Sequence, residues 1–194
     1  MKPKGIRNLV SFFFEVGNLR RVAREHQQML LFQDSTDNIA SHSFRTTIIG
    51  YFLAKELKAD ADKVIKMCLL HDIEEVRSGD HNWVHKRYVK VYEDEIRKEQ
   101  LQNLVHAEEL LKFSKEYEER KTLEAKIAKD ADLLDECFLL NEYIWQGSKE
   151  ASEWLKNNEQ EKRMFTDLAK QIAKEAKNQE PSFWWKQLWT PNRR

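Results

Sequence analysis

The sequence VIKMCLLHD, residues 64–72, decides the fold. Its apolar side chains occupy nearly every side of a helix, which predicts a helix buried at the centre of the molecule. Asp60 or Asp62 can cap this helix at its start. The stretch ends in His71 and Asp72, side chains that are rarely buried without partners. A buried helix that ends in ionisable residues predicts that this end lies at a polar site inside a helical bundle.

The composition of the whole chain favours an all-α protein. Five glycines and three prolines among 194 residues are about a third of the average share, and folds with many hairpins need these residues in their turns. Charged residues make up 34% and hydrophobic residues 41% of the chain, which suits amphipathic helices and argues against disorder. No linker, repeat or low-complexity segment divides the sequence, so we expect one domain over residues 1–194.

Helical periodicity extends on both sides of the central stretch. It predicts a first helix from Leu9 to Val22, a polar break at 34–38, and a helix from Ile39 to Leu57. Beyond the central helix it predicts a break at 78–80, a loop or short turn at 81–87, a charged helix around 96–111 and a break near 116–120. A helix ending at Gly147, an amphipathic helix over 154–176 and an aromatic tail at 183–189 complete the chain. We expect residues 149–194 to pack on the bundle or, for the tail, at a subunit contact.

Charge and apolar content restrict the partners and the compartment. Lys and Arg number 33 and Asp and Glu number 33, so the formal net charge is zero, unlike that of a nonspecific nucleic-acid binder. Cys68 and Cys137 lie in apolar runs, which predicts reduced core residues. No apolar run approaches the roughly 18–20 residues of a membrane span, and Glu15 interrupts the first apolar run. We therefore expect a soluble, cytoplasmic protein with no membrane and no nucleic acid as partner.

Four ionisable residues fall among core positions of three predicted helices: His42, His71, Asp72 and Asp132. Burying an unpaired carboxylate costs several kcal/mol, so two carboxylates and two imidazoles require a common partner. One divalent transition metal, such as zinc, manganese, cobalt, nickel or iron, is the simplest. Glu75 lies on the same helix face as His71 and Asp72 and would reach a metal-bound water.

Three segments carry a family resemblance: Ser41-His42-Ser43, HDIEEVRSGD at residues 71–80, and KDADL at residues 129–133. They resemble the HD-domain metal-dependent phosphohydrolases, and most closely their 5′-deoxynucleotidase branch. The resemblance covers roughly residues 18–145. It implies an all-α, cytoplasmic, often dimeric enzyme that removes phosphate from nucleoside 5′-monophosphates with one transition-metal ion.

The resemblance also implies roles for individual residues. His42, His71, Asp72 and Asp132 would be the metal ligands, with Asp130 as the competitor of Asp132. Glu75 would act on the attacking water, and Asp80 would lie near the sugar or shape the site. Arg24 would bind phosphate, with Arg20 and Arg21 as alternatives. Family members commonly place a Trp after this Arg, whereas Glu25 and His26 follow here, so the choice between a deoxy and a ribo sugar stays open.

Further cations surround these segments. Arg45 shares a helix face with His42 and either approaches the phosphate or pairs with a carboxylate. Lys86 either adds positive charge at the mouth of the site or is a surface cation. His81 and His85 share the i, i+4 spacing of some zinc ligands, but without an adjacent Glu they are better interpreted as part of a solvated or substrate-facing loop.

Two other functions remain open at this point. An HD-type phosphodiesterase or pyrophosphohydrolase acting on a signalling nucleotide would use the same ligands. A helical interaction module with a structural metal would use the aromatic tail and the charged helices as its working surface. We nevertheless expect a phosphohydrolase that acts on nucleoside 5′-monophosphates. Its substrate would be a small nucleotide and its assembly a homodimer.

Overall fold

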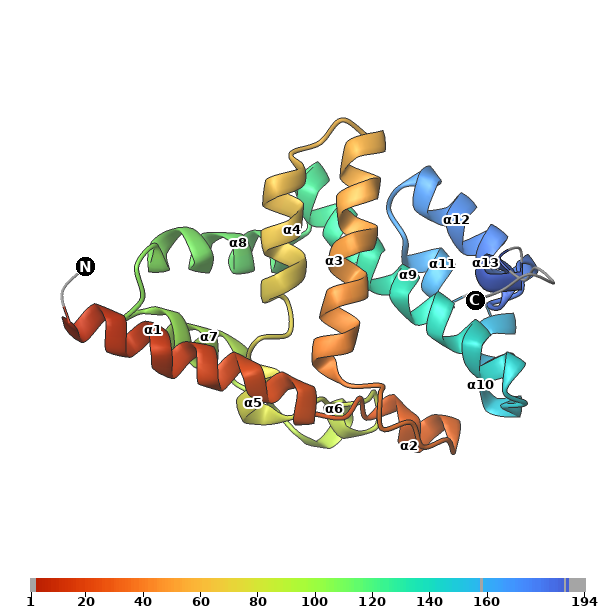
Figure 1. Ribbon diagram of the computed structural model, residues 1–194, viewed down its shortest axis with the longest axis horizontal. Coiled ribbons are helices and arrows are strands. Elements are labelled where there is room, and N and C mark those ends of the chain that lie inside the picture. Colours follow the sequence, from red (N-terminus) through yellow and green to blue (C-terminus); the bar gives the residue numbers. More distant parts are fainter. Residues whose placement is uncertain (1–2, 158, 187, 189–194) are drawn as a thin grey trace.

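The structure is a computed structural model that describes residues 3–157, 159–186 and 188 (Figure 1). It confirms the predicted all-α fold, because no strand occurs within these ranges and only an isolated bridge joins Ala23 and Asn38. The elements are α1 (Pro3–Val16), a 3-10 helix η1 (Gly17–Arg21), α2 (His26–Leu30), α3 (Ile39–Glu56), α4 (Ala61–Leu70), α5 (Glu75–Ser78), α6 (His85–Tyr88), α7 (Glu93–Leu101), α8 (Ala107–Glu119), α9 (Leu123–Trp145), α10 (Lys149–Lys156), α11 (Glu159–Arg163), α12 (Asp167–Asn178) and α13 (Phe183–Lys186).

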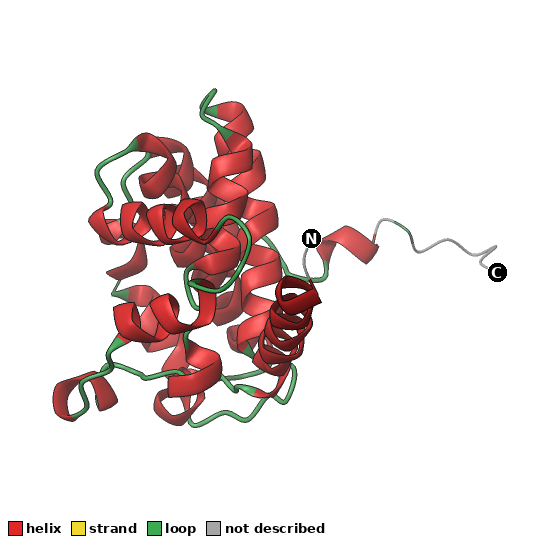
Figure 2. Cartoon of the chain, turned by 90° about the vertical axis from the view of Figure 1, so that its left-hand side faces the viewer, coloured by secondary structure: helices red, strands yellow, loops and turns green. Residues whose placement is uncertain are grey.

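Helices α3, α4 and α9 form the centre of the bundle and lie side by side (Figures 1 and 2). Val64, Met67 and Cys68 of α4 are fully buried, as the apolar stretch predicts. One face of α4 differs from the prediction, because Leu69 exposes 52% of its surface. Cys68 and Cys137 are both free and buried, in agreement with the sequence.

The ends of these helices follow from local chemistry. Asp60, and not Asp62, caps α4 by accepting a hydrogen bond from the Lys63 amide at 3.1 Å. Helix α9 ends where Gly147 adopts a positive φ of 93°, and the Ser148 amide then donates to the Tyr143 carbonyl at 2.9 Å. This is the glycine stop that the sequence predicts, since a glycine has no Cβ to strain in this conformation.

Two predicted helices are divided in the structure. The charged helix around 96–111 is two helices: α7 ends at Leu101, and α8 begins after His106, whose left-handed backbone interrupts the helical path before α8. The predicted helix over 154–176 is three helices, α10 to α12. Its main break is held by Asp130, whose carboxylate accepts hydrogen bonds from the Phe165 and Thr166 amides at 2.7 and 2.8 Å.

The C-terminal segment packs on the bundle through α10 and α12, both of which contact α9. Beyond them, the aromatic residues of α13 stay largely accessible in the single chain, and Trp184 exposes 71% of its surface. Gln187 and Trp189 of the predicted tail lie outside the described residues. Within the described ranges, no helix combines the length and the apolar character needed to cross a bilayer.

Gly50 marks the closest approach of the three central helices. A Cβ at this position would lie 2.8 Å from Cys68 Sγ and 3.0 Å from Val64 Cγ1. We expect Gly50→Ala to lower the free energy of unfolding by about 1–3 kcal/mol through overpacking, although alanine is the better helix former. Chemical denaturation measures the change.

Two further variants make this prediction specific to the helix contact. Cys68→Ala added to Gly50→Ala should restore part of the lost stability, because it removes the Sγ atom that the new Cβ meets. Gly17→Ala should be close to neutral, since a Cβ at Gly17 meets nothing within 4 Å. Equal effects of the two glycine substitutions would contradict the argument.

Candidate metal centre

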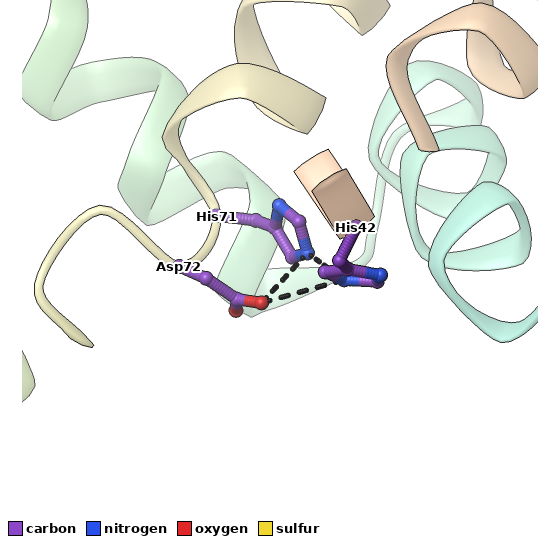
Figure 3. A group of neighbouring side chains, drawn as sticks. All are labelled: His42, His71 and Asp72. Carbon is purple, nitrogen blue, oxygen red and sulfur yellow. Dashed lines mark hydrogen bonds and ion pairs between the residues drawn. The ribbon is translucent and has the colours of Figure 1, made fainter. Parts of the chain in front are cut away.

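Four side chains converge where the three central helices meet, and Figure 3 shows three of them, His42, His71 and Asp72. His42 lies in the first turns of α3, a helix that Asn38 caps. His71 and Asp72 follow the end of α4, and Asp132 lies on α9. The Nε2 atoms of His42 and His71 are 3.0 Å apart. Asp72 Oδ2 lies 3.4 and 3.1 Å from these nitrogens, and Asp132 Oδ1 lies 3.3 and 3.9 Å from them.

The opposite nitrogen of each imidazole fixes its tautomer. His42 Nδ1 lies 2.6 Å from Asp135 Oδ2, and His71 Nδ1 lies 2.7 Å from the Cys68 carbonyl oxygen. Because both partners are acceptors, each Nδ1 carries a proton and donates it. In the neutral rings both Nε2 lone pairs then face each other, an arrangement that requires a positive charge between them. This is the arrangement of histidines that bind metals in proteins.

The donor set fits a divalent transition metal. Metal–nitrogen distances of about 2.0–2.1 Å place neighbouring ligand atoms roughly 3 Å apart. Most of the separations between the nitrogen and oxygen atoms of this cluster are close to that value. Burial and the Arg24 charge favour a neutral His42, yet hydrogen bonds to Asp132, Asp135 and Asp72 raise the pKa of this imidazole well above its ordinary value. The cluster therefore favours a positive charge at its centre, and its mixed nitrogen and oxygen donors leave the identity of the metal open.

Asp132 is held in a defined orientation by residues of its own neighbourhood. Its Oδ2 atom accepts a hydrogen bond from Lys129 Nζ at 2.5 Å and from the Tyr117 hydroxyl at 3.4 Å, which leaves Oδ1 for the cluster. Asp130, the competing carboxylate, instead holds the turn before α12. The geometry thus brings Asp132 to the centre and keeps Asp130 away from it.

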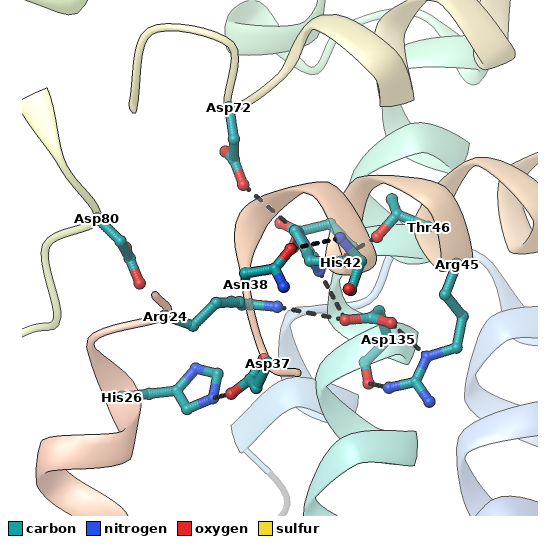
Figure 4. Close-up of polar contacts among 12 residues, drawn as sticks. Arg24, His26, Asp37, Asn38, His42, Arg45, Thr46, Asp72, Asp80 and Asp135 are labelled. Atoms are coloured by element: carbon teal, nitrogen blue, oxygen red, sulfur yellow. Dashed lines mark hydrogen bonds and ion pairs between the residues drawn. The ribbon is translucent and has the colours of Figure 1, made fainter. Parts of the chain in front are cut away.

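Asp135 is a functional residue that the sequence reasoning missed (Figure 4). Besides His42, its carboxylate accepts hydrogen bonds from Arg45 Nε at 2.5 Å and from Arg24 at 3.2 Å. Burial opposes ionisation, but the contact with His42 and the two arginines lower the pKa of Asp135 to about 2. The sequence does contain a signal for Asp135. Lys129, Asp132 and Asp135 follow one another at intervals of three residues and therefore share one face of a helix.

The two arginines lie on different sides of Asp135. Arg24 is largely buried and lines the same cavity as His71, Asp72 and Asp132, whereas Arg20 and Arg21 do not line it. Arg45 points away from this cavity, and its second partner is Glu142 at 2.6 Å (Figure 4). The structure therefore places Arg45 in the carboxylate pairing that the sequence left open, outside the cavity.

The cavity beside the cluster has a volume of about 380 Å³, within the range of small-molecule sites. Glu75, Asp80 and Lys86 all line it. Asp80 Oδ2 accepts a hydrogen bond from the Glu25 amide at 2.7 Å, so this carboxylate ties the loop after α5 to the segment that carries Arg24. Most of the sequence-predicted residues thus gather around one cavity. Arg45 and His42 do not line it, although the Nε2 atom of His42 meets His71 and Asp72 in the cluster.

Glu75 differs from its neighbour Glu74. The Glu74 carboxylate pairs with Arg97 at 3.1 Å, whereas Glu75 Oε2 is buried and makes no hydrogen bond with any residue that the structure describes. Burial, together with the charges of Asp72 and Asp80, raises the pKa of Glu75 to about 11. A carboxyl group that faces the cavity without a partner is suited to proton transfer.

Where the resembling enzymes commonly have a Trp, this chain has Glu25 and His26. The His26 ring is buried and its Nε2 atom lies 2.7 Å from Asp37 Oδ2. Asp37 in turn accepts a hydrogen bond from the Tyr143 hydroxyl at 3.0 Å. His26 lines the cavity, but its Nε2 atom is committed to Asp37.

Comparisons with known proteins agree with this geometry. Residues 16–178 match the family of HD domains. The chain belongs to the HD domain family. It is 28% identical to the 5′-deoxynucleotidase HDDC2 of Bos taurus over 153 residues, which are 74% of this chain and 71% of that protein. The resemblance to HD-domain metal-dependent phosphohydrolases that the three sequence segments indicate is thereby confirmed.

Solved structures share the fold. A conserved hypothetical protein of Pyrococcus furiosus has a TM-score of 0.74 at 25% identity, over 88% of this chain and 99% of that one. A protein of Magnetospirillum magnetotacticum described as a predicted metal-dependent phosphohydrolase has a TM-score of 0.64 at 20% identity, over 90% and 92% of the two chains. The second likeness supports the fold alone.

The role of Asp135 can be tested through metal affinity. Asp135→Asn should weaken the binding of Co²⁺ about 10- to 100-fold, because the partners of metal-binding histidines usually contribute this much. Calorimetry and the visible absorption of bound Co²⁺ measure the affinity. Asp130→Asn is the matched control: it removes a buried carboxylate charge from the same helix and should lower the melting temperature while leaving Co²⁺ affinity unchanged. Unaltered affinity in the folded Asp135→Asn variant would refute the role.

Proposed function

We propose that this HD-domain protein is a phosphomonoesterase that hydrolyses nucleoside 5′-monophosphates. The observation that carries the proposal is the convergence of four candidate metal-ligand atoms beside a cavity. The largely buried Arg24 lines this cavity, as does Glu75, whose Oε2 atom has no hydrogen-bond partner among the described residues. The similarity to a 5′-deoxynucleotidase over most of the chain supports the same substrate class.

His42, His71, Asp72 and Asp132 would hold one divalent transition metal. When bound, such an ion polarises a phosphoryl oxygen and lowers the pKa of a nearby water. Arg24 and Lys86 would bind the remaining phosphoryl oxygens, and the fixed guanidinium of Arg24 would offset the charge that develops there. Asp80 would keep Arg24 in place through the Glu25 amide.

Glu75 would move the proton in this reaction. The positive charge of a bound metal would favour the ionised form of Glu75. Its carboxylate would then take a proton from the water as the water oxygen attacks phosphorus and the bond between phosphorus and the sugar 5′-oxygen breaks. That oxygen leaves as the nucleoside hydroxyl after it receives a proton. The burial of Glu75 and the absence of a partner among the described residues support this role.

A nucleotide panel tests the proposal. We expect orthophosphate release from nucleoside 5′-monophosphates to depend on added Co²⁺, Mn²⁺ or Zn²⁺, and comparison of ribo and deoxy substrates sets the sugar preference. Asp72→Ala should abolish this turnover, because it removes a ligand, and Glu75→Gln should lower kcat about 10²- to 10⁴-fold, as the loss of a general base does. Arg20→Gln is the contrasting variant, because Arg20 is exposed and does not line the cavity, and its activity should stay unchanged.

The products distinguish the competing activities. Release of a nucleotide from a diester, or of pyrophosphate, would favour a phosphodiesterase or a pyrophosphohydrolase. Bound metal without turnover of any phosphate ester would favour an interaction module with a structural metal. Undiminished activity in the Asp72→Ala variant, with its helical circular dichroism retained, would contradict the metal assignment.

We also propose that two copies associate. Apolar side chains that stay exposed in the single chain form a stripe on α1 and another on α3, at the spacings of one helix face. The residues are Ile6, Val10, Phe13 and Phe14, and Phe44, Ile48, Tyr51 and Phe52. Stripes of this kind are typical of surfaces that become buried on association.

Sedimentation velocity tests this association. We expect a dimer for the unaltered chain and a shift toward monomers when Phe14→Ser and Phe52→Ser are combined, because both changes place a polar group in the stripes. Leu31→Ser is the control, since Leu31 is exposed but belongs to neither stripe. A monomeric unaltered chain would exclude the dimer.

A further inference from the structure

Trp83 is an exposed aromatic residue on the wall of the cavity that holds the candidate metal centre. Its side chain exposes 65% of its surface and lines the same cavity as Arg24, Asp72 and Lys86. Other exposed aromatic side chains of this region, such as Tyr88, do not line this cavity. A large apolar ring facing a polar cavity gains stability only when something covers it.

The backbone around Trp83 is held firmly, so the exposure of its ring belongs to an ordered loop. The preceding residue, Asn82, is buried and donates hydrogen bonds to the Glu25 carbonyl at 3.1 Å and to Gln28 at 3.0 Å. Its Oδ1 atom accepts from the Val84 and His85 amides at 2.9 and 3.0 Å. These four bonds position Trp83 in advance of any ligand.

The same contacts link Trp83 to the phosphate end of the cavity. Both Asn82 and Asp80 bond to the backbone of Glu25, the residue directly after Arg24. The backbone segments that carry the aromatic ring and the guanidinium are thus joined by one short connection. A ligand that satisfies both carries an anion at one end and a flat aromatic group at the other.

We propose that Trp83 is the platform on which the nucleobase of the substrate stacks. This inference rests on the proposed function and adds the part of the site that recognises the base. Every nucleobase presents a π-face, so stacking on an aromatic side chain depends little on which base is bound. Trp154 also lines the cavity, but it is partly buried against the cluster around Tyr143 and Leu155, so it forms part of the wall.

Kinetic measurements on substrates with and without a nucleobase test the role of Trp83. In Trp83→Ala, the KM for a nucleoside 5′-monophosphate and the Ki of the free nucleoside should rise about 5- to 150-fold, which is the range of stacking contributions. The kcat/KM for ribose 5-phosphate and 2-deoxyribose 5-phosphate, which lack a base, should stay unchanged. Trp83→Phe should retain most of the affinity, since it keeps an aromatic face.

Tyr88→Ala is the matched control, because Tyr88 is an equally exposed aromatic five residues away that does not line the cavity. Its kinetic constants should equal those of the unaltered enzyme. An unchanged KM in Trp83→Ala, or an equal loss for base-free phosphates, would overturn the platform while leaving the phosphatase proposal intact.

If the unaltered enzyme hydrolyses no nucleotide, the proposed function fails and calorimetry with a nucleoside decides on Trp83 separately. Nucleoside binding that is lost in Trp83→Ala and kept in Tyr88→Ala would support the platform. Binding that is absent from the unaltered protein, or unaffected by the substitution, would overturn it.

Discussion

Two imidazole nitrogens that face each other at 3.0 Å impose the constraint on which the site depends. His42 and His71 can occupy these positions because each donates its other proton to a fixed acceptor, Asp135 in one case and the Cys68 carbonyl in the other. With both lone pairs directed inward, the pair requires positive charge between the rings. Asp72 and Asp132 reinforce this requirement from two further sides.

The packing of the three central helices makes this arrangement possible. Helix α3 supplies His42, the end of α4 supplies His71 and Asp72, and α9 supplies Asp132 and Asp135. The lack of a side chain at Gly50 on α3 leaves room for Cys68 and Val64 of α4 and Ala131 of α9. Because protein interiors are closely packed, a displacement of one helix would change the ligand separations directly.

The charges of the molecule act locally. A net charge of zero gives the chain no general attraction for polyanions, and the described structure concentrates ionised groups around one cavity. Asp135 binds Arg24 and Arg45 on two sides, so a single buried carboxylate connects His42, a candidate metal ligand, with Arg24, a candidate phosphate ligand. The loop of Asp80 and Asn82 adds a second connection to the same backbone segment.

The sequence by itself determined the helical class, because scarce Gly and Pro and periodic apolar residues act through local backbone preferences. It also predicted His42, His71, Asp72 and Asp132 as metal ligands, since buried ionisable residues are conspicuous in apolar runs and their ordered segments carry a family resemblance. The structure brings these four side chains together. The division of the charged helix and of the C-terminal helix escaped prediction, because His106 and Asp130 act through backbone geometry and a distant turn.

Only the tertiary structure decided which groups share a cavity. It separated Arg24 from Arg45, which lie on opposite sides of Asp135, and it revealed Asp135 itself as the partner of His42. It also brought Trp83 to the rim of the cavity through Asn82. Hydrogen bonds and ion pairs between residues some 60 to 110 positions apart leave no periodic signal in the sequence, since they depend on how the helices pack and not on local spacing.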